Sequence, residues 1–494
     1  MPESSEKNNN APHYEYDSSL DNWITDEKSG FEFVNIVGQL YYDKSIELII
    51  FRSQLIDRTS SVILKKHSHS LSVIGKALKI QDSVLLSREL LNMDLPPARI
   101  DIGKLNRQWT DEGSNYPDAR AFLNDKLKRL IGKKVNYEKP VDVVVYGFGR
   151  IGRLVTRELI IQGNGTQLNV KAIVTRGNSP EEIRKRASLF RNDSIHGPFR
   201  GVAIEDVDNK FLMINGHKVK MISATNPEEI DYEAEGIHDA LLIDSTGVWT
   251  NREDLARHLK AKGIRKVMVT APAKGDVPNI VYGVNHDDGT VDFNTENIFS
   301  AASCTTNAIV PVLYVIENKL GIDKGHIETI HAYTNDQNLT DNYHKKPRRG
   351  RSAPINMVLT STGAALAAAK AIPSLKGKLT ANAVRVPIPN VSLAIISLTV
   401  QKQTTVEEVV EILRDAALNG RLVEQIRFSA STEAVSTDFI GDSCAGIFDA
   451  PATLVSADGK SIILYVWYDN EFGYTIQALR LAKKIAGVQW ETYY

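Results

Sequence analysis

The sequence predicts an α/β protein with a doubly wound parallel sheet, a following α+β domain with a mixed sheet, and a helical N-terminal extension. Three observations predict this. Short β-branched runs alternate with helical segments after residue 140, longer strand-like runs follow residue 304, and apolar residues recur every three or four positions before residue 95. At 494 residues the chain exceeds a single core, which indicates two or three domains.

Residues 1–138 are expected to form the helical extension, an interaction or assembly module with an unknown partner. About the first 28 residues are polar and predict disorder. The helical pattern then runs over about 31–95, including the isoleucine-rich run at 46–50, and a second helix is expected over 119–131. No motif in this extension carries recognisable chemistry.

A buried strand of the parallel-sheet kind, VDVVVY, begins at Val141 and is followed by a helical segment. Further strand-like runs lie at 170–174, 240–243, 267–269 and 280–281. These runs predict a doubly wound domain over 139–303, completed by a C-terminal helix over 477–494. Strands in a second domain over 304–476 are expected within 384–399 and 461–468.

The composition excludes several classes of protein. Lys and Arg number 59 against 60 Asp and Glu, so no strongly basic field exists to bind nucleic acid or a membrane surface. No apolar run reaches the length of a membrane span. The only cysteines, Cys304 and Cys444, are too few for a disulfide framework or a tetrahedral zinc site, so we expect no metal. Together with the polar N-terminus, this predicts a cytoplasmic protein.

A glycine motif, GFGRIG over 147–152, follows the Val141 strand directly and opens a helix. In a Rossmann dinucleotide site, the first glycine permits a tight turn and the second lets the backbone approach a pyrophosphate. The third allows close packing of helix on strand. The free amides at the helix start favour phosphate, so this segment predicts dinucleotide binding.

The end of the second strand bears on which dinucleotide binds. An acidic residue there would hydrogen-bond the adenosine ribose and repel a 2′-phosphate, but this chain has Thr175-Arg176. Arg176 either pairs with a 2′-phosphate or points into solvent, and both interpretations stay open. The expected cofactor is therefore NAD or NADP.

Cys304 lies in a run of small residues where an apolar helix begins, and His331 lies 27 positions later at the end of a strand-like run. Alone, such a cysteine is more often buried and inert, and such a histidine is more often structural. A helix start favours the thiolate, however, and serine and threonine suit its cap. Beside a dinucleotide fold, the two residues indicate a nucleophile and its base.

Seven motifs in order carry a resemblance to a known family. They are YGFGRIG at 146–152, STG at 245–247, APAK at 271–274, ASCTTN at 302–307, YTNDQ at 333–337, RVPIPN at 385–390 and WYDNEFGY at 467–474. From about residue 140 to its end the chain resembles the phosphorylating glyceraldehyde-3-phosphate dehydrogenases, and its extension is similar to that of the long bacterial forms. The resemblance implies a homotetramer that acts in glycolysis or gluconeogenesis.

The resemblance also implies a mechanism. Cys304 attacks the aldehyde of glyceraldehyde 3-phosphate with His331 as base, and inorganic phosphate cleaves the resulting thioester to 1,3-bisphosphoglycerate. By the family pattern, the substrate phosphate is bound by Thr334, Arg349 and Arg385. The attacking phosphate is surrounded by Ser303, Thr305, Thr362 and Gly363.

The implied dinucleotide contacts come from both ends of the matching region. They are Gly147, Gly149, Arg150, Ile151, Gly152, Thr175, Arg176, Thr246, Thr270, Asn470 and Tyr474. In the family pattern Asn470 orients the nicotinamide carboxamide, and Tyr474 lies near the nicotinamide ring.

Two departures from the pattern concern the cofactor. The acid at the second strand is absent, and Asn342-Tyr343 replaces the Leu-Pro pair before His344-Lys345. Both changes remove features associated with excluding a 2′-phosphate. One rival activity is erythrose-4-phosphate dehydrogenase, which the segment at 341–344 resembles slightly, although YTNDQ favours the glyceraldehyde substrate. The other alternative is a long-form enzyme with an added partner-binding role.

Overall fold

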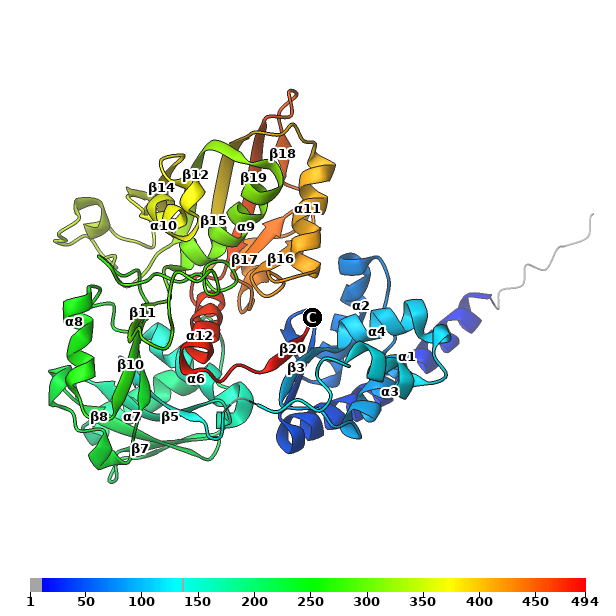
Figure 1. Ribbon diagram of the computed structural model, residues 1–494, viewed down its shortest axis with the longest axis horizontal. Helices are drawn as coiled ribbons and strands as arrows, with labels where there is room; N and C mark the ends of the chain where they lie inside the picture. Colours follow the sequence, from blue (N-terminus) through cyan, green and yellow to red (C-terminus); the bar gives the residue numbers. More distant parts are fainter. Residues whose placement is uncertain (1–10, 136) are drawn as a thin grey trace, which may run out of the picture. The chain divides into compact units, whose positions relative to one another are not determined.

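The computed structural model describes residues 11–135 and 137–494, which fall into two compact units (Figure 1). The first unit contains the residues up to 135 together with 490–494, and the second contains residues 136–489. The last five residues of the chain therefore belong with its beginning. Among the described residues, no helix combines the length and hydropathy that a membrane crossing requires.

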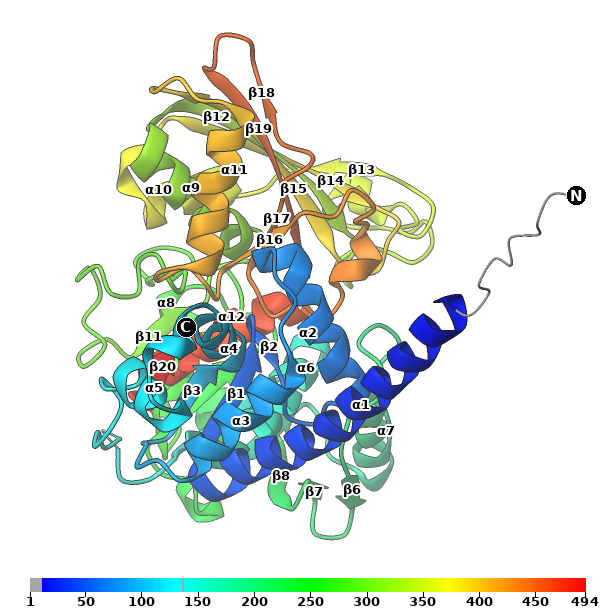
Figure 2. The same ribbon diagram turned by 90° about the vertical axis from the view of Figure 1, so that its right-hand side faces the viewer.

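The first unit is built on a four-stranded sheet in the order β2-β1-β3-β20. β1 (Ile46–Ile50) pairs antiparallel with β2 (Ser53–Gln54) and parallel with β3 (Ala98–Asp101), and β20 (Glu491–Tyr493) adds in parallel to β3. The helices of this unit are α1 (Ala11–Lys44), α2 (Ser60–Ile74), α3 (Ile80–Leu91), α4 (Ile102–Glu112) and α5 (Ala119–Lys126). Figure 2 shows α1 and α3 running side by side.

Two expectations for this unit were wrong in detail. The run at 46–50 is a strand, because Ser45 takes a left-handed φ of 55° after the helix and the isoleucine-rich segment is buried on both faces. Residues 11–28, expected to be disordered, belong to α1. Polar residues hold this helix to its neighbours: Ser60 Oγ donates to Glu27 Oε1 at 2.6 Å, and Gln81 Nε2 donates to Asp26 Oδ1 at 2.7 Å. The rest of that expectation, residues 1–10, lies outside the described residues.

The second unit begins with the predicted doubly wound sheet, in the order β11-β10-β9-β4-β5-β8-β7-β6. The first six of these run parallel, and β7 and β6 add antiparallel at one edge. The strands are β4 (Val141–Tyr146), β5 (Leu168–Thr175), β6 (Ala203–Asp206), β7 (Phe211–Ile214), β8 (His217–Ser223), β9 (Ala240–Asp244), β10 (Ile264–Val269) and β11 (Ile298–Ser300). No strand forms at 280–281, where one was expected. The chain makes only an isolated bridge between Asn279 and Ser300, although Ile280 and Val281 are both buried.

Three helices of this region matter for the site: α6 (Arg150–Ile161), α7 (Pro180–Arg191) and α12 (Phe472–Ala486). α12 comes from the far end of the chain and shares one apolar core with β4 and β5. The helix expected over 477–494 therefore starts earlier and stops sooner. It ends because Gly487 adopts a left-handed φ of 72°, after which the chain crosses to β20.

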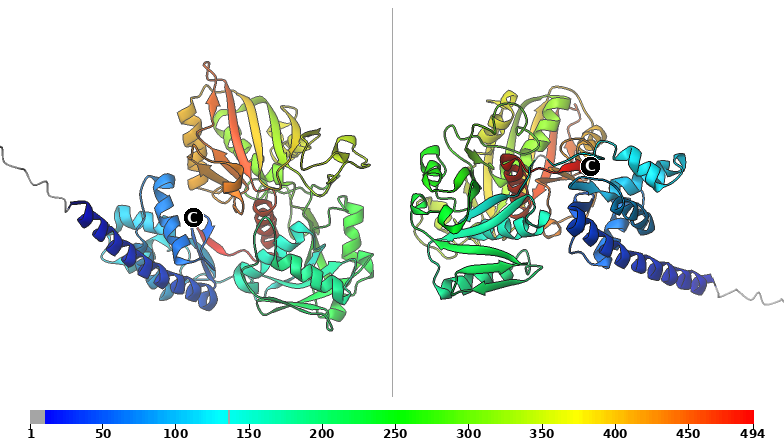
Figure 3. Two further views of the ribbon diagram at one scale, coloured as in Figure 1. Left: turned by 180° about the vertical axis from the view of Figure 1, so that it is seen from behind. Right: turned by 60° about the horizontal axis from the view of Figure 1, so that its bottom comes forward.

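A mixed sheet forms the rest of the second unit, in the order β13-β14-β12-β15-β19-β17-β16, with β18 paired to β19. Its strands are β12 (Ile322–Ala332), β13 (Val358–Thr360), β14 (Leu379–Val386), β15 (Ser392–Val400), β16 (Ile426–Ser429), β17 (Gly446–Asp449), β18 (Leu454–Val455) and β19 (Ser461–Tyr468). The helices α9 (Cys304–Leu320), α10 (Ala364–Ala371) and α11 (Val406–Leu418) share one core with the inward side chains of this sheet. Figure 3 shows the strands from the side that these helices leave open.

Deleting residues 490–494 tests whether the end of the chain completes the first unit. The deletion removes the pairing of β20 with β3 and the hydrogen bond from Tyr493 Oη to Gln108 Oε1, 2.6 Å long. We expect the free energy of unfolding of the first unit to fall by about 2 kcal/mol or more. Hydrogen exchange of residues 11–135 measures this. Thr492→Val, which keeps the strand, is the control, and unchanged protection after the deletion would contradict the prediction.

Candidate active site

Cys304 is the first residue of α9, and its position is held by local hydrogen bonds. Ser303 caps the helix, its Oγ accepting from the Thr306 backbone amide at 3.0 Å. Asn307 Nδ2 donates to the carbonyl oxygens of Ala301 at 2.8 Å and Ser303 at 2.9 Å, which fixes the turn before the helix. The thiol therefore lies where the helix dipole favours a negative charge, as the sequence predicted.

His331 is the last residue but one of β12, a central strand of the mixed sheet. Its Nε2 lies 3.5 Å from Cys304 Sγ, and only 6% of the residue is exposed. The structure thus brings the two predicted catalytic residues together from different elements. A sulfur and an imidazole nitrogen at this distance are within range of proton transfer.

The charges around this pair set its protonation. Burial raises the pKa of the Cys304 thiol, while the Arg385 guanidinium and the Thr305 amide oppose that rise. Burial also lowers the pKa of His331 to about 3, and Arg385 adds to that effect. His331 is therefore neutral near pH 7, which is the state in which its Nε2 can take a proton.

Arg385 also touches the other side of the imidazole ring. Its Nη1 lies 2.7 Å from His331 Nδ1 and 2.8 Å from the Ala332 carbonyl oxygen, and Nδ1 is 2.7 Å from that same oxygen. Because arginine only donates, Nδ1 either accepts from Arg385 or donates to Ala332. Only the second tautomer leaves a lone pair on Nε2 facing the sulfur. The position of Arg385 is thus coupled to the basicity of His331.

Arg349, the second predicted phosphate ligand, lies in the loop after β12. Its guanidinium forms an ion pair with Asp336, and its Nη2 donates to Thr360 Oγ1 at 3.1 Å. The charge of Arg349 contributes to the lowered pKa of His331. The pKa of Arg349 itself is lowered by burial and, to a smaller extent, by Arg385. Two neighbouring guanidinium groups beside His331 are the kind of pair that binds a dianion.

The hydroxyl groups predicted around the phosphates have other partners. Ser303 Oγ lies 2.6 Å from Thr306 Oγ1, and Thr305 Oγ1 lies 3.0 Å from the buried Tyr468 hydroxyl. The remaining predicted residues, Thr334, Thr362 and Gly363, lie in the loop after β12 and at the start of α10. Among the described residues, no hydrogen bond joins these three to Cys304 or His331.

The glycine motif forms the expected turn between β4 and α6. Gly147 has a φ of 93°, and a Cβ there would lie 2.8 Å from Thr246 Cγ2. A Cβ on Gly152 would collide with the Gly147 carbonyl oxygen. Gly149 caps α6 without a side-chain hydrogen bond, so the first amides of the helix stay free to bind a phosphate. These features fit the pyrophosphate of a dinucleotide.

A cleft of about 360 Å³ adjoins this turn at the carboxyl ends of the parallel strands. Its lining residues are Tyr146, Gly147, Phe148, Gly149, Val174, Thr175, Arg176, Arg186, Ala224, Thr225, Thr246, Val248 and Trp249. Such a position is where doubly wound sheets bind nucleotides. Of the predicted contacts, Ile151 packs partly buried against the core, and Thr175 Oγ1 donates to the Gly177 carbonyl oxygen at 2.7 Å.

A buried carboxylate that the sequence analysis missed supports this cleft. Asp244 Oδ1 accepts from the Thr246 amide and hydroxyl, both at 2.7 Å, and its Oδ2 lies 3.2 Å from His258 Nε2. Thr270 Oγ1 donates to the Asp244 carbonyl oxygen at 3.1 Å. The two predicted threonines are therefore both anchored to Asp244, which ends a buried strand and carried no sequence signal of its own.

The segment that carries Asn470 is tied to the glycine turn. Glu471 Oε1 accepts from Arg150 Nε at 2.6 Å, and its Oε2 lies 3.0 Å from His196 Nε2. Although burial opposes it, His196 and Arg150 lower the pKa of Glu471. The guanidinium of Arg150, a residue predicted to contact the cofactor, thus forms an ion pair with Glu471. Glu471 lies inside the WYDNEFGY motif, so that motif could have revealed it.

Asn470 and Tyr474 are hydrogen-bonded to residues close to the catalytic pair. Ser392 Oγ donates to Asn470 Oδ1 at 2.9 Å, which fixes the orientation of the buried Asn470 amide. The Tyr474 hydroxyl donates to the Ala302 carbonyl oxygen at 3.1 Å, two residues before Cys304. Both residues thus connect the start of α12 to the neighbourhood of the thiol.

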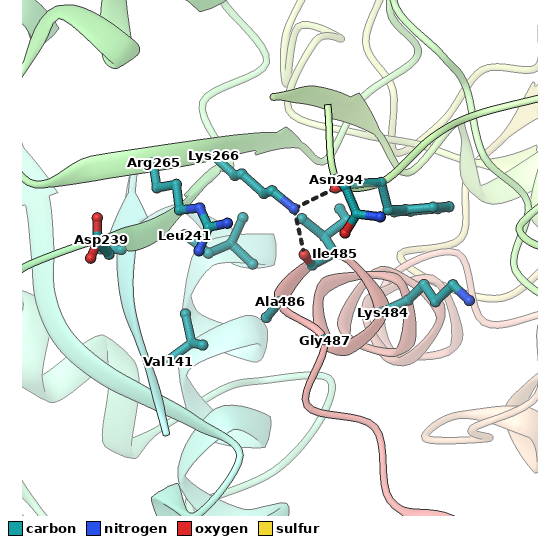
Figure 4. A pocket seen from close by; sticks show the side chains of 12 residues that line it. Val141, Asp239, Leu241, Arg265, Lys266, Asn294, Lys484, Ile485, Ala486 and Gly487 are labelled. Atoms are coloured by element: carbon teal, nitrogen blue, oxygen red, sulfur yellow. Dashed lines mark hydrogen bonds between the residues drawn. The ribbon is translucent and has the colours of Figure 1, made fainter. Parts of the chain in front are cut away.

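A smaller pocket of about 160 Å³ lies at the opposite, amino ends of β4, β9 and β10 (Figure 4). Its buried cation, Lys266, donates through Nζ to the carbonyl oxygens of Phe293 at 2.6 Å and Ile485 at 3.0 Å. These carbonyl oxygens satisfy the ammonium group, and one of them belongs to the last turn of α12. Lys266 therefore caps the C-terminus of that helix and is not free to bind a ligand in the pocket.

Comparison with known families agrees with this geometry. The family model described as "Glyceraldehyde 3-phosphate dehydrogenase, NAD binding domain" matches residues 141–252. The model described as "Glyceraldehyde 3-phosphate dehydrogenase, C-terminal domain" matches residues 303–470. The two matches cover the glycine turn and the thiol–imidazole pair.

Curated relatives of two lengths are similar to the chain. A "Glyceraldehyde-3-phosphate dehydrogenase-like protein" of Pseudomonas aeruginosa is 47% identical over 459 residues, which are 92% of this chain and 98% of that protein. "Glyceraldehyde-3-phosphate dehydrogenase 2" of Trichormus variabilis is 41% identical over 346 residues, 70% of this chain and 98% of that protein. The first alignment must include most of the N-terminal unit, which the shorter relative lacks.

Replacing Arg385 with methionine tests its electrostatic role. Arg385 opposes the rise in the pKa of Cys304, so its loss raises that pKa further and lowers the thiolate fraction at pH 7. We expect the alkylation of Cys304 by iodoacetamide to slow about tenfold. Mass spectrometry of the peptide that contains Cys304 measures this rate. Arg351→Met, which removes an exposed arginine paired with Asp341, is the control. An unchanged alkylation rate in the Arg385 variant would exclude the effect.

Proposed function

The chain belongs to the glyceraldehyde-3-phosphate dehydrogenase family, and we propose that it oxidises glyceraldehyde 3-phosphate to 1,3-bisphosphoglycerate, using inorganic phosphate and NAD(P). The observation that carries this proposal is the 3.5 Å approach of Cys304 Sγ to His331 Nε2 beside two arginines. The reaction places the enzyme in glycolysis, or in gluconeogenesis when it runs in reverse.

In the first step the Cys304 sulfur bonds to the aldehyde carbon while His331 Nε2 takes the thiol proton. His331 passes this proton to the aldehyde oxygen, which becomes the hydroxyl of a thiohemiacetal, and takes it back from that hydroxyl as the carbon loses a hydride. When bound, the nicotinamide supplies the acceptor for that hydride. A thioester of Cys304 remains, and inorganic phosphate attacks its carbonyl carbon, so that the thiolate leaves and the acyl phosphate is released.

Arg349 and Arg385 bind the substrate phosphate in this proposal, with Thr334. The geometry supports a concerted change: when Arg385 turns toward a phosphate it leaves His331 Nδ1, which then donates to the Ala332 carbonyl oxygen. The lone pair of Nε2 then faces the sulfur. Substrate binding therefore selects the tautomer in which His331 is a base. Ser303, Thr305, Thr362 and Gly363 serve the attacking phosphate.

We also propose how the protein assembles and where in the cell it acts. The open face of the mixed sheet presents half-buried apolar side chains, with Leu393 opposite Trp467 and Ile395 opposite Tyr465. Such a face supports a homotetramer in which copies of the chain cover it. Because Cys304 must stay reduced, we place the enzyme in the cytoplasm.

The rival substrate is erythrose 4-phosphate, which the same thiol and base could oxidise. Steady-state kinetics with both aldehydes, with and without inorganic phosphate, decides between them. We expect a higher kcat/KM for glyceraldehyde 3-phosphate and a dependence of its turnover on phosphate. A preference for the four-carbon aldehyde would reject the proposed substrate while leaving the thiol mechanism in place.

Cys304→Ala tests the covalent mechanism. Without the sulfur no thiohemiacetal forms, so turnover should fall by at least about a thousandfold while the dissociation constant of the dinucleotide stays unchanged. Enzyme assays and calorimetric titration measure the two quantities. Cys444→Ala, at the buried second cysteine, is the matched control. If the Cys304 variant retained a tenth of the activity, the mechanism would be wrong.

The first unit serves a separate role, for which we propose binding of a partner or assembly. It carries exposed apolar side chains on α1, among them Trp23 and Phe31, and no residue of the thiol site. We expect a fragment of residues 137–489 to keep kcat within about twofold, because the site lies wholly inside it. A loss of oligomer or partner in that fragment, seen by light scattering, assigns the role. A hundredfold loss of kcat would instead make the first unit part of the enzyme.

A further inference from the structure

The dinucleotide cleft contains two arginines, and no acidic residue is among the described residues that line it. Arg176 directly follows β5, and Arg186 projects from α7. We propose that these two side chains bind a phosphate group on the 2′-oxygen of the adenosine ribose, so that the protein prefers a 2′-phosphorylated dinucleotide to the unphosphorylated one. This inference rests on the dinucleotide-binding part of the proposed function and on nothing in its aldehyde chemistry.

Arg186 carries the argument because its Nε is buried without a hydrogen-bond partner. A buried donor left unpaired is unfavourable, and a charged one more so, unless a ligand completes it. Among the described residues, neither Arg186 nor Arg176 forms an ion pair. Two guanidinium groups that face one cleft without a carboxylate between them repel each other and attract a dianion.

The local structure explains how Arg186 reaches the cleft. Ser179 and Glu182 form a capping box that starts α7, in which Glu182 Oε2 accepts from the Ser179 amide at 3.1 Å and from its hydroxyl at 2.9 Å. This box fixes the helix at the end of the loop that follows Arg176. Arg186 then lies one turn further along α7 than Glu182, at the cleft wall.

Glu182 is an acid on the same helix as Arg186, and it supplies the competing interpretation. A carboxylate that accepted hydrogen bonds from the ribose would favour the unphosphorylated dinucleotide. Glu182, however, is not among the residues that line the cleft, and its Oε2 accepts two hydrogen bonds from Ser179. A side chain at Gly177 would collide with this carboxylate, so the loop packs directly onto it. The hydrogen bonds from Ser179, with a smaller contribution from Arg186, lower the pKa of Glu182 and hold its Oε2 in the capping box.

Binding of two adenosine fragments to the full chain tests the proposal without any turnover. Isothermal titration compares 2′,5′-ADP with 5′-AMP, which differ by the 2′-phosphate, and then NADP with NAD. We expect the wild type to bind 2′,5′-ADP about tenfold or more tightly than 5′-AMP, as a charge-assisted contact provides, with a smaller difference at high salt. Equal binding, or tighter binding of 5′-AMP, would overturn the proposal.

Variants assign the effect to the two arginines. Arg186→Met should weaken 2′,5′-ADP about tenfold and leave 5′-AMP unchanged, Arg186→Lys should restore part of the loss, and Arg176→Met with Arg186→Met should abolish the discrimination. Arg184→Met, an exposed arginine of the same helix, is the matched control. If Arg186→Met weakened both fragments equally, Arg186 would not read the 2′-phosphate. Discrimination without oxidation of glyceraldehyde 3-phosphate would reject the proposed function alone.

Discussion

The distance of 3.5 Å between Cys304 Sγ and His331 Nε2 requires a helix start and a strand end to meet at one point. Each element brings its own support: the helix is capped by Ser303, and the strand lies between two others in the mixed sheet. The dinucleotide site depends on the same arrangement, since Tyr474 donates to the carbonyl oxygen just before the turn to Cys304. A shift of either element would separate the thiol from its base, and a shift of α9 would also move the thiol relative to Tyr474.

Arg385 is the charged group closest in effect to this pair, and we propose that it also binds the substrate phosphate. The same guanidinium opposes the rise in the thiol pKa, lowers the pKa of His331, and hydrogen-bonds beside the imidazole. One cation thus acts on both nucleophile and base, and in our proposal a bound phosphate that draws it away changes the pKa of each. The Arg150 side chain joins the glycine turn to the segment of Asn470 through Glu471, a contact that the sequence analysis did not predict.

The two units share the chain in an unusual order. α12 completes the core of the dinucleotide domain, and the residues that follow it form a strand of the first unit. The first unit is therefore connected to the second at residue 135 and again at residue 490. Removing only the N-terminal segment would leave β20 without the strand it pairs with, so a clean separation must cut at both positions.

The sequence by itself determined the fold class of the second unit and most of its candidate site. The glycine motif, the buried strands and the seven ordered segments are local patterns, and local patterns survive in a linear sequence. The sequence failed at the run 46–50, which has helical spacing but forms a strand because it is buried on both faces in the folded unit.

Only the tertiary structure decided which groups face each other. The pairing of Arg150 with Glu471 spans 321 positions, and the support of the threonines by Asp244 and His258 joins separate elements. Arg186 carries no motif, and its importance comes from a buried nitrogen beside a cleft. Long-range contacts of this kind depend on packing, and packing is a property of the folded chain that residue spacing does not encode.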